Sequence, residues 1–302
     1  MESNSNKNNP LIYKLIIIFL YIIIIYENIK FIKKSIKYKS HVNKGNNIMI
    51  KNKDAQSKLE YYKNYINDIP FYQHSHIYSN NIYWCWLQGI DNSPELYRTT
   101  FNSVKKNCHK HNIIIINETN INEYAKFPSY IIEKYKNNTI SNTHFSDLLR
   151  LELLIKYGGT WIDASVLITK YEEKFFKKDL FFFNLSNWFI TSEKDSPVLK
   201  TTRDLLYEYW RRENYLFYYF IFHEFLAISY QRYKKDHLNM PDISNIPEHS
   251  LQRHLIKKIN DTLYSDILKN ASIHKLNIKF INKYFNFKDS LLNHIMNIYS
   301  TK

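Results

Sequence analysis

Glycine, proline and cysteine are scarce in this chain, which has 4, 7 and 2 of them in 302 residues. The two cysteines, Cys85 and Cys108, provide neither a disulfide framework nor the ligand pattern of a structural zinc site, and they favour a reducing compartment. A disordered protein is excluded, because 44% of the residues are hydrophobic and 17% are aromatic. The length suffices for a sizeable core in one large domain or two modest ones.

Acidic residues are few near the amino end. The formal charge is +14, and the lysines between Lys30 and Lys63 greatly outnumber the acids Asp54 and Glu60. Such a concentrated basic stretch favours a membrane surface with anionic lipid over a nucleic-acid groove. The chain also has no interleaved aromatic and basic motif, so we expect membrane lipid and no nucleic acid among its partners.

The longest apolar run is "PLIYKLIIIFLYIIIIY", Pro10–Tyr26. As a helix, its 17 residues span roughly 25 Å, which is marginal for a bilayer core. A buried core helix or a cleaved signal peptide would be the alternatives, but a basic stretch follows the run and no small-residue cleavage site does. We expect residues 1–40 to be a membrane anchor, spanning or interfacial. By the positive-inside rule, the catalytic domain would then lie on the cytoplasmic side.

The remaining chain divides into a linker and a globular part. Residues 41–80 are polar, with one helix expected over Ala55–Ile66. From residue 81 the pattern predicts a strand (81–89), a helix (94–107), a fully apolar strand (112–119) and a helix (129–138). Further strand is expected within 179–193, and a helical, aromatic part begins near Ser196. This order predicts an α/β nucleotide-binding domain over residues 81–302.

The segment "SDLLRLELLIKYGGTWIDAS", residues 146–165, holds the main candidates for chemistry. Asp147 and Arg150 share one face of a predicted helix. Two consecutive glycines can end that helix in the left-handed conformation and turn the chain into a strand, Thr160–Ser165. On that strand Asp163 and Ser165 point to one side. The spacing therefore predicts that these polar side chains converge at the carboxyl end of a strand, where open α/β sheets bind ligands.

Residues 141–165, "SNTHFSDLLRLELLIKYGGTWIDAS", resemble the core of the DXD-containing glycosyltransferases of family 32 and their relatives. The resemblance is greatest to the capsular polysaccharide synthesis branch. Weaker similarity extends to "WCWLQGIDNSPEL" (84–96) and "NIPEHSLQ" (245–252), so that residues 81–252 are covered. Three of the four glycines, Gly89, Gly158 and Gly159, lie in these motifs.

The resemblance implies a GT-A type fold, in which helices flank a mixed, mainly parallel sheet, followed here by a helical C-terminal part. It also implies a retaining glycosyltransferase that moves a sugar from a nucleotide-sugar donor, which we expect to be UDP-linked. The acceptor would be a growing surface polysaccharide or a lipid-linked glycan. A sugar-phosphate transferase and a non-catalytic membrane scaffold of polysaccharide assembly are the alternatives.

The same resemblance implies roles for individual residues. Asp147 would bind hydroxyls of the donor sugar, and Arg150 would contact the sugar or the diphosphate. Trp86 would stack on the nucleotide base or, alternatively, belong to the core. The remaining substrate contacts would come from Gly159 and from His249, which lies beside Glu248 in a loop near the phosphates.

The DXD motif of this chain departs from the family pattern. Asp163 matches its first aspartate, which holds Mn²⁺ or Mg²⁺ against the diphosphate, but Ser165 stands at the second position. A hydroxyl is a weaker, neutral ligand, so a metal would be held by Asp163 and Ser165 through water or chiefly by the diphosphate. The pattern therefore leaves metal dependence open.

Three other sets of residues are weaker candidates. His74 and His76 are expected to be solvated in a polar loop. The segment Cys108–His111 lacks a second pair of metal ligands. His223 and Glu224 form either an acid/base pair on the acceptor side or a buried core pair.

Overall fold

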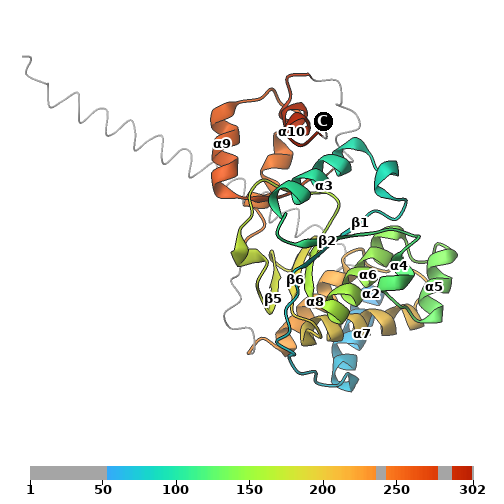
Figure 1. Cartoon of the computed structure of the whole chain (residues 1–302). Helices are drawn as coiled ribbons and strands as arrows, with labels where there is room; N and C mark the ends of the chain where they lie inside the picture. The colour runs from blue at the N-terminus through green and yellow to red at the C-terminus, as the bar shows by residue number, and fades with distance from the viewer. Residues whose placement is uncertain (1–52, 236–242, 278–287, 301–302) are drawn as a thin grey trace, which may run out of the picture. The chain divides into compact units, whose positions relative to one another are not determined.

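The computed structural model describes residues 53–235, 243–277 and 288–300 (Figure 1). The predicted membrane anchor lies outside these ranges, and no helix within them is long and apolar enough to span a bilayer. The chain divides into two compact units, Met1–Glu60 and Tyr61–Lys302. Helix α2 (Lys53–Tyr65) agrees with the predicted helix; it begins in the first unit and ends in the second.

A five-stranded sheet in the order β2-β1-β3-β6-β5 forms the centre of the second unit. Its strands are β1 (Asn81–Cys85), β2 (Asn112–Ile116), β3 (Gly159–Ile162), β5 (Leu180–Phe182) and β6 (Phe189–Ser192). Strand β1 pairs in parallel with β2 and β3, whereas β6 is antiparallel to both β3 and β5. Only β6 therefore runs against the other strands, and the predicted mixed, mainly parallel sheet is confirmed.

Strand β2 lies at one edge of this sheet, although its run of isoleucines predicts a strand buried within it. Ile113, Ile114 and Ile115 are only partly buried, and Ile116 is the one isoleucine of β2 that is fully buried. An edge strand has a neighbour on one side only, and this position explains the partial exposure.

The apolar stretch 179–193, in which further strand is expected, folds as a hairpin of two strands. Strands β5 and β6 pair through Leu180 and Ser192 at the open end. Between them Asn184 and Leu185 adopt positive φ values of 42° and 57°. The Ser186 amide donates to the Phe183 carbonyl over 2.8 Å and closes the turn. Asn184 and Leu185 are the central residues of a four-residue turn, Phe183–Ser186, which lies within the longer connection between Phe182 and Phe189.

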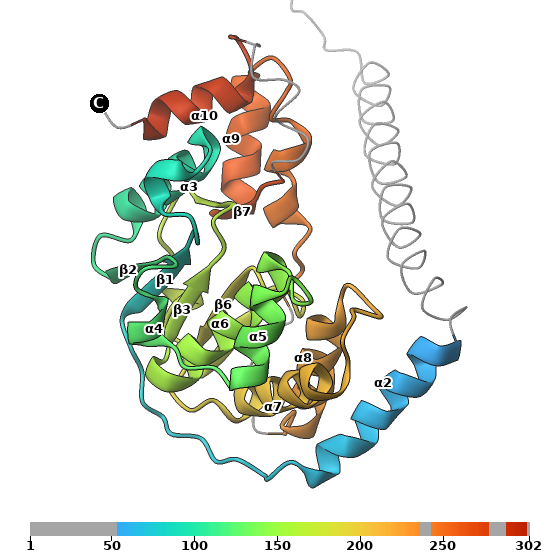
Figure 2. The same cartoon turned by 90° about the vertical axis from the view of Figure 1, so that its right-hand side faces the viewer.

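Helices cover both faces of the sheet (Figure 2). Helix α3 (Glu95–Asn107) packs on one face, where Val104 joins Ile82 and Ile162 in an apolar cluster. Helix α6 (Asn142–Tyr157) covers the other face and follows two short helices, α4 (Ile121–Tyr124) and α5 (Ser129–Lys136). Behind α6 lie α7 (Pro197–Arg212) and α8 (Ile221–Arg232). The two faces are thus closed by segments that are far apart in the sequence.

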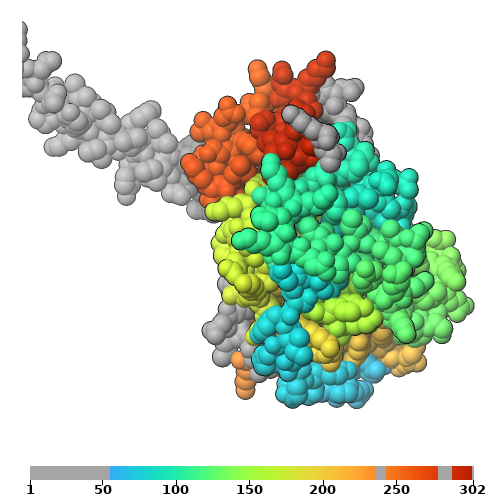
Figure 3. All heavy atoms as spheres, viewed as in Figure 1, coloured from blue at the N-terminus to red at the C-terminus, as the bar shows by residue number. Residues whose placement is uncertain are grey.

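The C-terminal part contains helices α9 (Asp261–Asn270) and α10 (Leu291–Tyr299), and also a strand that the sequence does not predict. This strand, β7 (Ile273–Lys275), pairs antiparallel with β4 (Val166–Ile168) in a separate two-stranded sheet. Helix α10 lies against α3, as the red and teal segments of Figure 3 show, and Asn102 Nδ2 donates to the Tyr299 carbonyl over 2.8 Å.

The end of the predicted linker, residues 66–80, belongs to the second unit and is hydrogen-bonded to other parts of that unit. Tyr72 donates its hydroxyl proton to Asp204 Oδ2. His74 Nδ1 pairs with Glu193, whose carboxylate is fully buried, and the His76 amide donates to the same carboxylate over 2.6 Å. The expectation of solvated histidines is therefore wrong for His74, because a buried carboxylate needs donors and this loop supplies them.

Candidate active site

Helix α6 carries the predicted cluster and has well-defined ends. Ser141 Oγ accepts from the His144 amide over 3.4 Å at the N-terminus. Leucines on several sides of the helix are buried between the sheet and α7, so the helix is firmly packed. At the C-terminal end the Gly158 amide donates to the Leu154 carbonyl over 2.8 Å. The φ of Gly158 is positive as predicted, but its ψ of −173° differs from the left-handed helical conformation.

The double glycine makes the turn that the sequence predicts. Gly158 and Gly159 have φ values of +67° and +103°. A Cβ atom would lie 2.7 Å from the Lys194 amide nitrogen at Gly158 and 2.5 Å from the Asn81 carbonyl oxygen at Gly159. Both positions therefore need glycine, for conformation and for space. Gly159 was also expected to contact substrate, but it is buried in β3 against Asn81.

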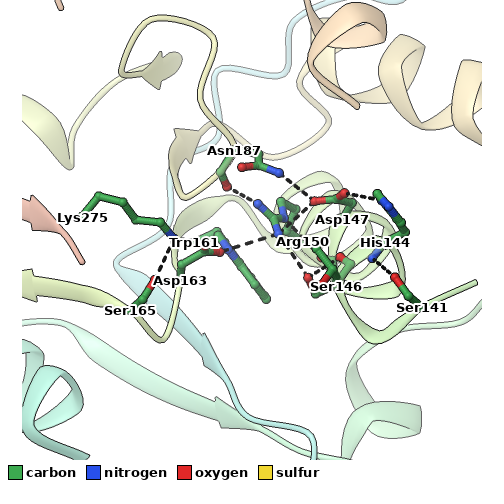
Figure 4. Close-up of polar contacts among 11 residues, drawn as sticks. Ser141, His144, Ser146, Asp147, Arg150, Trp161, Asp163, Ser165, Asn187 and Lys275 are labelled. Carbon is green, nitrogen blue, oxygen red and sulfur yellow. Dashed lines mark hydrogen bonds and ion pairs between the residues drawn. The ribbon is translucent and has the colours of Figure 1, made fainter. Parts of the chain in front are cut away.

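Arg150 lies at the centre of the cluster and is only 2% exposed (Figure 4). Its Nη2 lies 3.0 Å from Asp147 Oδ1 and 3.6 Å from Asp163 Oδ1. The remaining donors reach the Ser146 carbonyl and hydroxyl and the Asn187 carbonyl. The predicted convergence of Arg150 with the two aspartates is confirmed. A guanidinium so enclosed orients both carboxylates, and it has little surface left for a ligand.

Asp147 is buried as well, with 4% of its surface exposed. Besides Arg150, Asn187 Nδ2 donates to its Oδ1 over 2.8 Å, and His144 Nδ1 lies 3.4 Å from its Oδ2. Its contact with the donor sugar stays a prediction. Asn187 is a partner that the motif does not contain, whereas His144 lies three residues before Asp147 on the same helix and could have been found from that spacing.

Asp163 follows the last residue of β3, and its side chain is 22% exposed. The strand is shorter than predicted, because the Val166 amide donates to the Asp163 carbonyl over 2.9 Å and turns the chain into β4. Trp161 Nε1 donates to Asp163 Oδ1 over 2.8 Å. Burial by itself would raise the pKa of Asp163, but Lys275, Arg150 and the donated hydrogen bonds outweigh it and lower this pKa to about 2. Asp163 is thus a fixed anion at neutral pH.

Lys275 completes the exposed side of the cluster and is the residue that sequence reasoning missed. Its Nζ lies 2.6 Å from Asp163 Oδ2 and 2.7 Å from Ser165 Oγ. The pairing of β7 with β4 places Lys275 opposite Val166, directly after the turn. The short segment Ile273–Lys275 has no pattern that would name its partner strand. No signal in the sequence therefore points to this contact.

An aromatic pair borders the same region. The Trp86 ring packs against the Tyr97 ring at a centroid distance of 4.3 Å. Burial first, and then the charge of Asp163, raise the pKa of Tyr97. Trp86 is partly exposed, and its Nε1 is buried without a partner in the part of the chain that the structure describes. These observations leave open both predicted roles of Trp86, base stacking and core packing.

His249 and Glu248 face different surroundings. The His249 ring lies edge-on to Trp188 at 6.0 Å, and burial together with the charges of Lys275 and Arg253 lowers its pKa to about 4. Glu248 lines a separate pocket of about 810 Å³ that also includes Lys174. Burial raises the pKa of Glu248 to about 7. Only His249 therefore belongs to the electrostatic environment of Lys275.

His223 and Glu224 also have different charged neighbours. Burial lowers the pKa of His223 to about 4, and its nearest charges are Asp147 and Arg150. Burial raises the pKa of Glu224, whose neighbouring charge is Lys63. His223 thus borders the cluster, whereas Glu224 does not share its charged environment.

The residues at the DXD position do not fit a divalent metal ion held by the protein alone. Within residues 53–235, 243–277 and 288–300, no group of three or more histidine, cysteine, aspartate or glutamate side chains is arranged to bind a metal. The predicted ligands Asp163 and Ser165 supply one carboxylate and one hydroxyl, and both are bonded to the Lys275 ammonium group. Mg²⁺ and Mn²⁺ need more oxygen ligands than this pair provides.

Comparison with known proteins places the chain in a family. The family model described as capsular polysaccharide synthesis protein matches residues 21–295 of the chain. The chain belongs to the capsular polysaccharide synthesis protein family. This result confirms the resemblance carried by the motif around Asp147, Arg150 and Asp163.

Two curated proteins are more distantly similar to this family member. The O-glycosyltransferase braB of Annulohypoxylon truncatum is 31% identical over 103 residues, 31% of this chain and 24% of its own length. The glycosyltransferase afumC of Aspergillus fumigatus is 26% identical over 161 residues, 44% of this chain and 41% of its own length. The chain thus spans less than half the length of either relative.

Among solved structures, the PaToxG glycosyltransferase aligns with 72% of this chain and 92% of its own, at 17% identity and a TM-score of 0.37. A likeness this low does not define the fold. The description of the fold therefore rests on the sheet order and the helices of the chain itself.

Proposed function

We propose that this member of the capsular polysaccharide synthesis protein family is a retaining glycosyltransferase with a GT-A type fold. It moves a sugar from a nucleotide-sugar donor, UDP-linked, to a growing polysaccharide or lipid-linked glycan. One observation supports the proposal most strongly. In the turn after β3, Asp163 bonds to Lys275 and lies beside Arg150, which is paired with buried Asp147. Two relatives with glycosyltransferase names support the same class.

Each part of the site has a role in this reaction. The ring of Trp86, backed by Tyr97, offers a stacking surface for a nucleotide base. The exposed edge of Asp163, Ser165 and Lys275 faces the diphosphate and the reacting carbon. The buried pair of Arg150 and Asp147 fixes the orientation of the Asp163 carboxylate, because a buried, hydrogen-bonded ion pair has little freedom to move.

The mechanism that we propose for retention is front-side attack. Asp163 is paired with Lys275, and Asp147 is enclosed by Arg150 and Asn187, so neither carboxylate is free to act as a nucleophile. The acceptor oxygen then bonds to the anomeric carbon while the bond to the phosphate oxygen breaks. The acceptor proton passes to the leaving phosphate.

The location follows from the same proposal. Residues 1–40 anchor the chain to the membrane, and the catalytic domain lies on the cytoplasmic side, where nucleotide sugars are available. The basic stretch after the apolar run contacts anionic lipid. Flotation with vesicles that contain anionic lipid, compared with a chain lacking residues 1–40, tests this placement.

Nucleotide release tests the reaction. The full chain in detergent micelles is incubated with UDP-, GDP- and CMP-sugars, and the released nucleotides are separated by chromatography. We expect one UDP-sugar to yield UDP, and the Asp163→Asn variant to lose this activity by about a hundredfold or more. The matched control Asp266→Asn removes a carboxylate from an exposed ion pair and leaves release unchanged.

The identity of the nucleotide separates the alternatives. A sugar-phosphate transferase would release UMP, because one phosphate leaves with the sugar. A non-catalytic scaffold would release no nucleotide and bind no nucleotide sugar. Either result would refute the glycosyltransferase assignment, and NMR of the product reports whether the anomeric configuration is retained.

A further inference from the structure

Lys275 occupies the place between the two DXD positions. Its ammonium group bonds to Asp163 Oδ2 at 2.6 Å and to Ser165 Oγ at 2.7 Å, one oxygen from each of the two side chains that were predicted to hold a metal (Figure 4). We propose that Lys275 is the cation of this site, so that donor binding and transfer need no divalent metal. The inference rests on the proposed glycosyltransferase function and adds to it the group that binds the diphosphate.

The position of Lys275 is fixed by the backbone. It lies opposite Val166 in the antiparallel pair of β7 and β4, and the Leu276 amide donates to the Ser165 carbonyl over 3.0 Å. The lysine and the DXD turn are therefore held by adjacent backbone hydrogen bonds. A cation held in this way needs little reorganisation when a diphosphate arrives.

The partner carboxylate is fixed as well. Trp161 Nε1 donates to Asp163 Oδ1, and Arg150 Nη2 lies 3.6 Å from the same oxygen. Asp163 thus turns its other oxygen, Oδ2, toward Lys275. This arrangement explains why the site keeps an aspartate although the second position is a serine: the aspartate positions a lysine.

Lys275 still has capacity to bind an anion. An ammonium group has three donors, and among the described residues two of them have partners, Asp163 and Ser165. The side chain is 21% exposed, so the third donor has access to a ligand. A diphosphate oxygen would accept it in a charge-assisted hydrogen bond.

A divalent ion at the same place would be opposed by charge. A divalent ion that shared Asp163 Oδ2 with the Lys275 ammonium group would be repelled by it, because like charges repel at short range. The protein also offers it one carboxylate only, and Ser165 Oγ is already an acceptor for Lys275. During transfer Lys275 keeps its proton and donates a hydrogen bond to the phosphate oxygen that receives the electron pair of the broken bond.

Nucleotide binding in the absence of metal tests the proposal. Calorimetry measures the binding of UDP, GDP and CMP to the full chain in detergent micelles, first with EDTA and then with Mn²⁺. We expect the wild type to bind UDP in EDTA, with no more than a twofold change on adding Mn²⁺. Lys275→Ala should weaken this binding by about tenfold to a hundredfold, the value of one charge-assisted hydrogen bond.

Matched variants separate a lost charge from a lost fold. Lys275→Arg keeps the cation and should retain binding in EDTA within about fivefold of the wild type, the residual loss reflecting the different shape of a guanidinium. Lys177→Ala removes a lysine from an exposed ion pair with Glu173 and should leave UDP binding unchanged. The double variant Ser165→Asp, Lys275→Ala restores two carboxylates without the lysine, and its UDP binding should become dependent on Mn²⁺.

Electron paramagnetic resonance of Mn²⁺ alone is a readout that needs no variant. The wild type without nucleotide should leave the signal of free Mn²⁺ intact. Loss of UDP binding in EDTA with recovery in Mn²⁺ would overturn the role of Lys275 and leave the glycosyltransferase proposal in place. Failure of all three nucleotides to bind under both conditions would overturn both proposals.

Discussion

Gly159 approaches Asn81 so closely that a Cβ atom on the glycine would lie 2.5 Å from the Asn81 carbonyl oxygen. This contact lies where β3 begins alongside β1, and the two strands then pair in parallel through Ile82 and Thr160. The close approach allows helix α6 to turn back directly into the sheet. As a result, Asp163, which directly follows β3, lies beside Arg150 on the helix.

Replacing Gly159 with alanine should therefore destabilise the fold. The φ of +103° costs a non-glycine residue about 1–2 kcal/mol, and the clash with Asn81 adds about 1–3 kcal/mol. Gly89→Ala is the matched control, since Gly89 also has a positive φ but a Cβ there would lie 3.9 Å from its nearest neighbour. Urea unfolding measures both variants, and equal losses would show that the close approach has no energetic weight.

Replacing Arg150 with methionine should destabilise the protein by about 3–5 kcal/mol, because it leaves buried Asp147 without its cation. The matched control is Arg211→Met, which removes a half-exposed arginine from its pair with Glu208 and should cost about 1 kcal/mol or less. Chemical unfolding of both variants provides the comparison. A loss at Arg150 no larger than at Arg211 would contradict the central role of the buried pair.

The stability contributed by Asp163 should depend on pH. Its pKa is lowered from 3.8 to about 2, so the folded state binds this proton more weakly than the unfolded state. The contribution, about 2 kcal/mol, is present above pH 4 and is lost as the pH falls through about 2. We expect Asp163→Asn to be destabilised relative to wild type at pH 7 and much less so at pH 2. A difference that stays constant over this range would contradict the ion pair with Lys275, and Asp266→Asn is the exposed control.

The stability contributed by Glu248 should change with pH in the opposite direction to that of Asp163. Burial raises its pKa from 4.5 to about 7, so between these values the unfolded state loses its proton first and stability falls as the pH rises. Glu248→Gln removes this ionisation and should stabilise the protein by up to about 3 kcal/mol at pH 8, with little change at pH 4. Glu133→Gln, at an exposed position, is the control variant.

Trp86 should contribute to nucleotide affinity if its ring stacks on the base. Removing an aromatic stacking partner costs about 1–3 kcal/mol, so Trp86→Ala should weaken UDP binding by about tenfold to a hundredfold. Trp86→Phe keeps an aromatic face next to Tyr97 and should retain most of the affinity. A variant that loses thermal stability but binds UDP as the wild type does would assign Trp86 to the core instead.

Several features followed from local sequence alone. A helix from about Ser146 to the double glycine and the following strand were predicted, because periodic leucines and a glycine turn with positive φ act over a few residues. The convergence of Asp147, Arg150 and Asp163 was predicted for the same reason. Their separation in the chain is short, and the turn between them leaves few conformations.

Other local sequence patterns were misleading, because they do not specify which distant segments pack beside them in the fold. The apolar run of β2 predicts burial, yet its place at the sheet edge decides the exposure of Ile113–Ile115. The apolar stretch 179–193 does not reveal the turn at Asn184 that divides it into β5 and β6. His74 looks solvated until the fold brings Glu193 beside it.

The sequence by itself determined the helix, the glycine turn and the acidic cluster, since each depends on residues close together in the chain. Only the tertiary structure decided what stands beside that cluster. Lys275 is 112 residues from Asp163 in sequence and reaches it only because β7 pairs with β4. A strand of three residues carries no pattern that selects its partner, so the partner is chosen by packing of the whole domain.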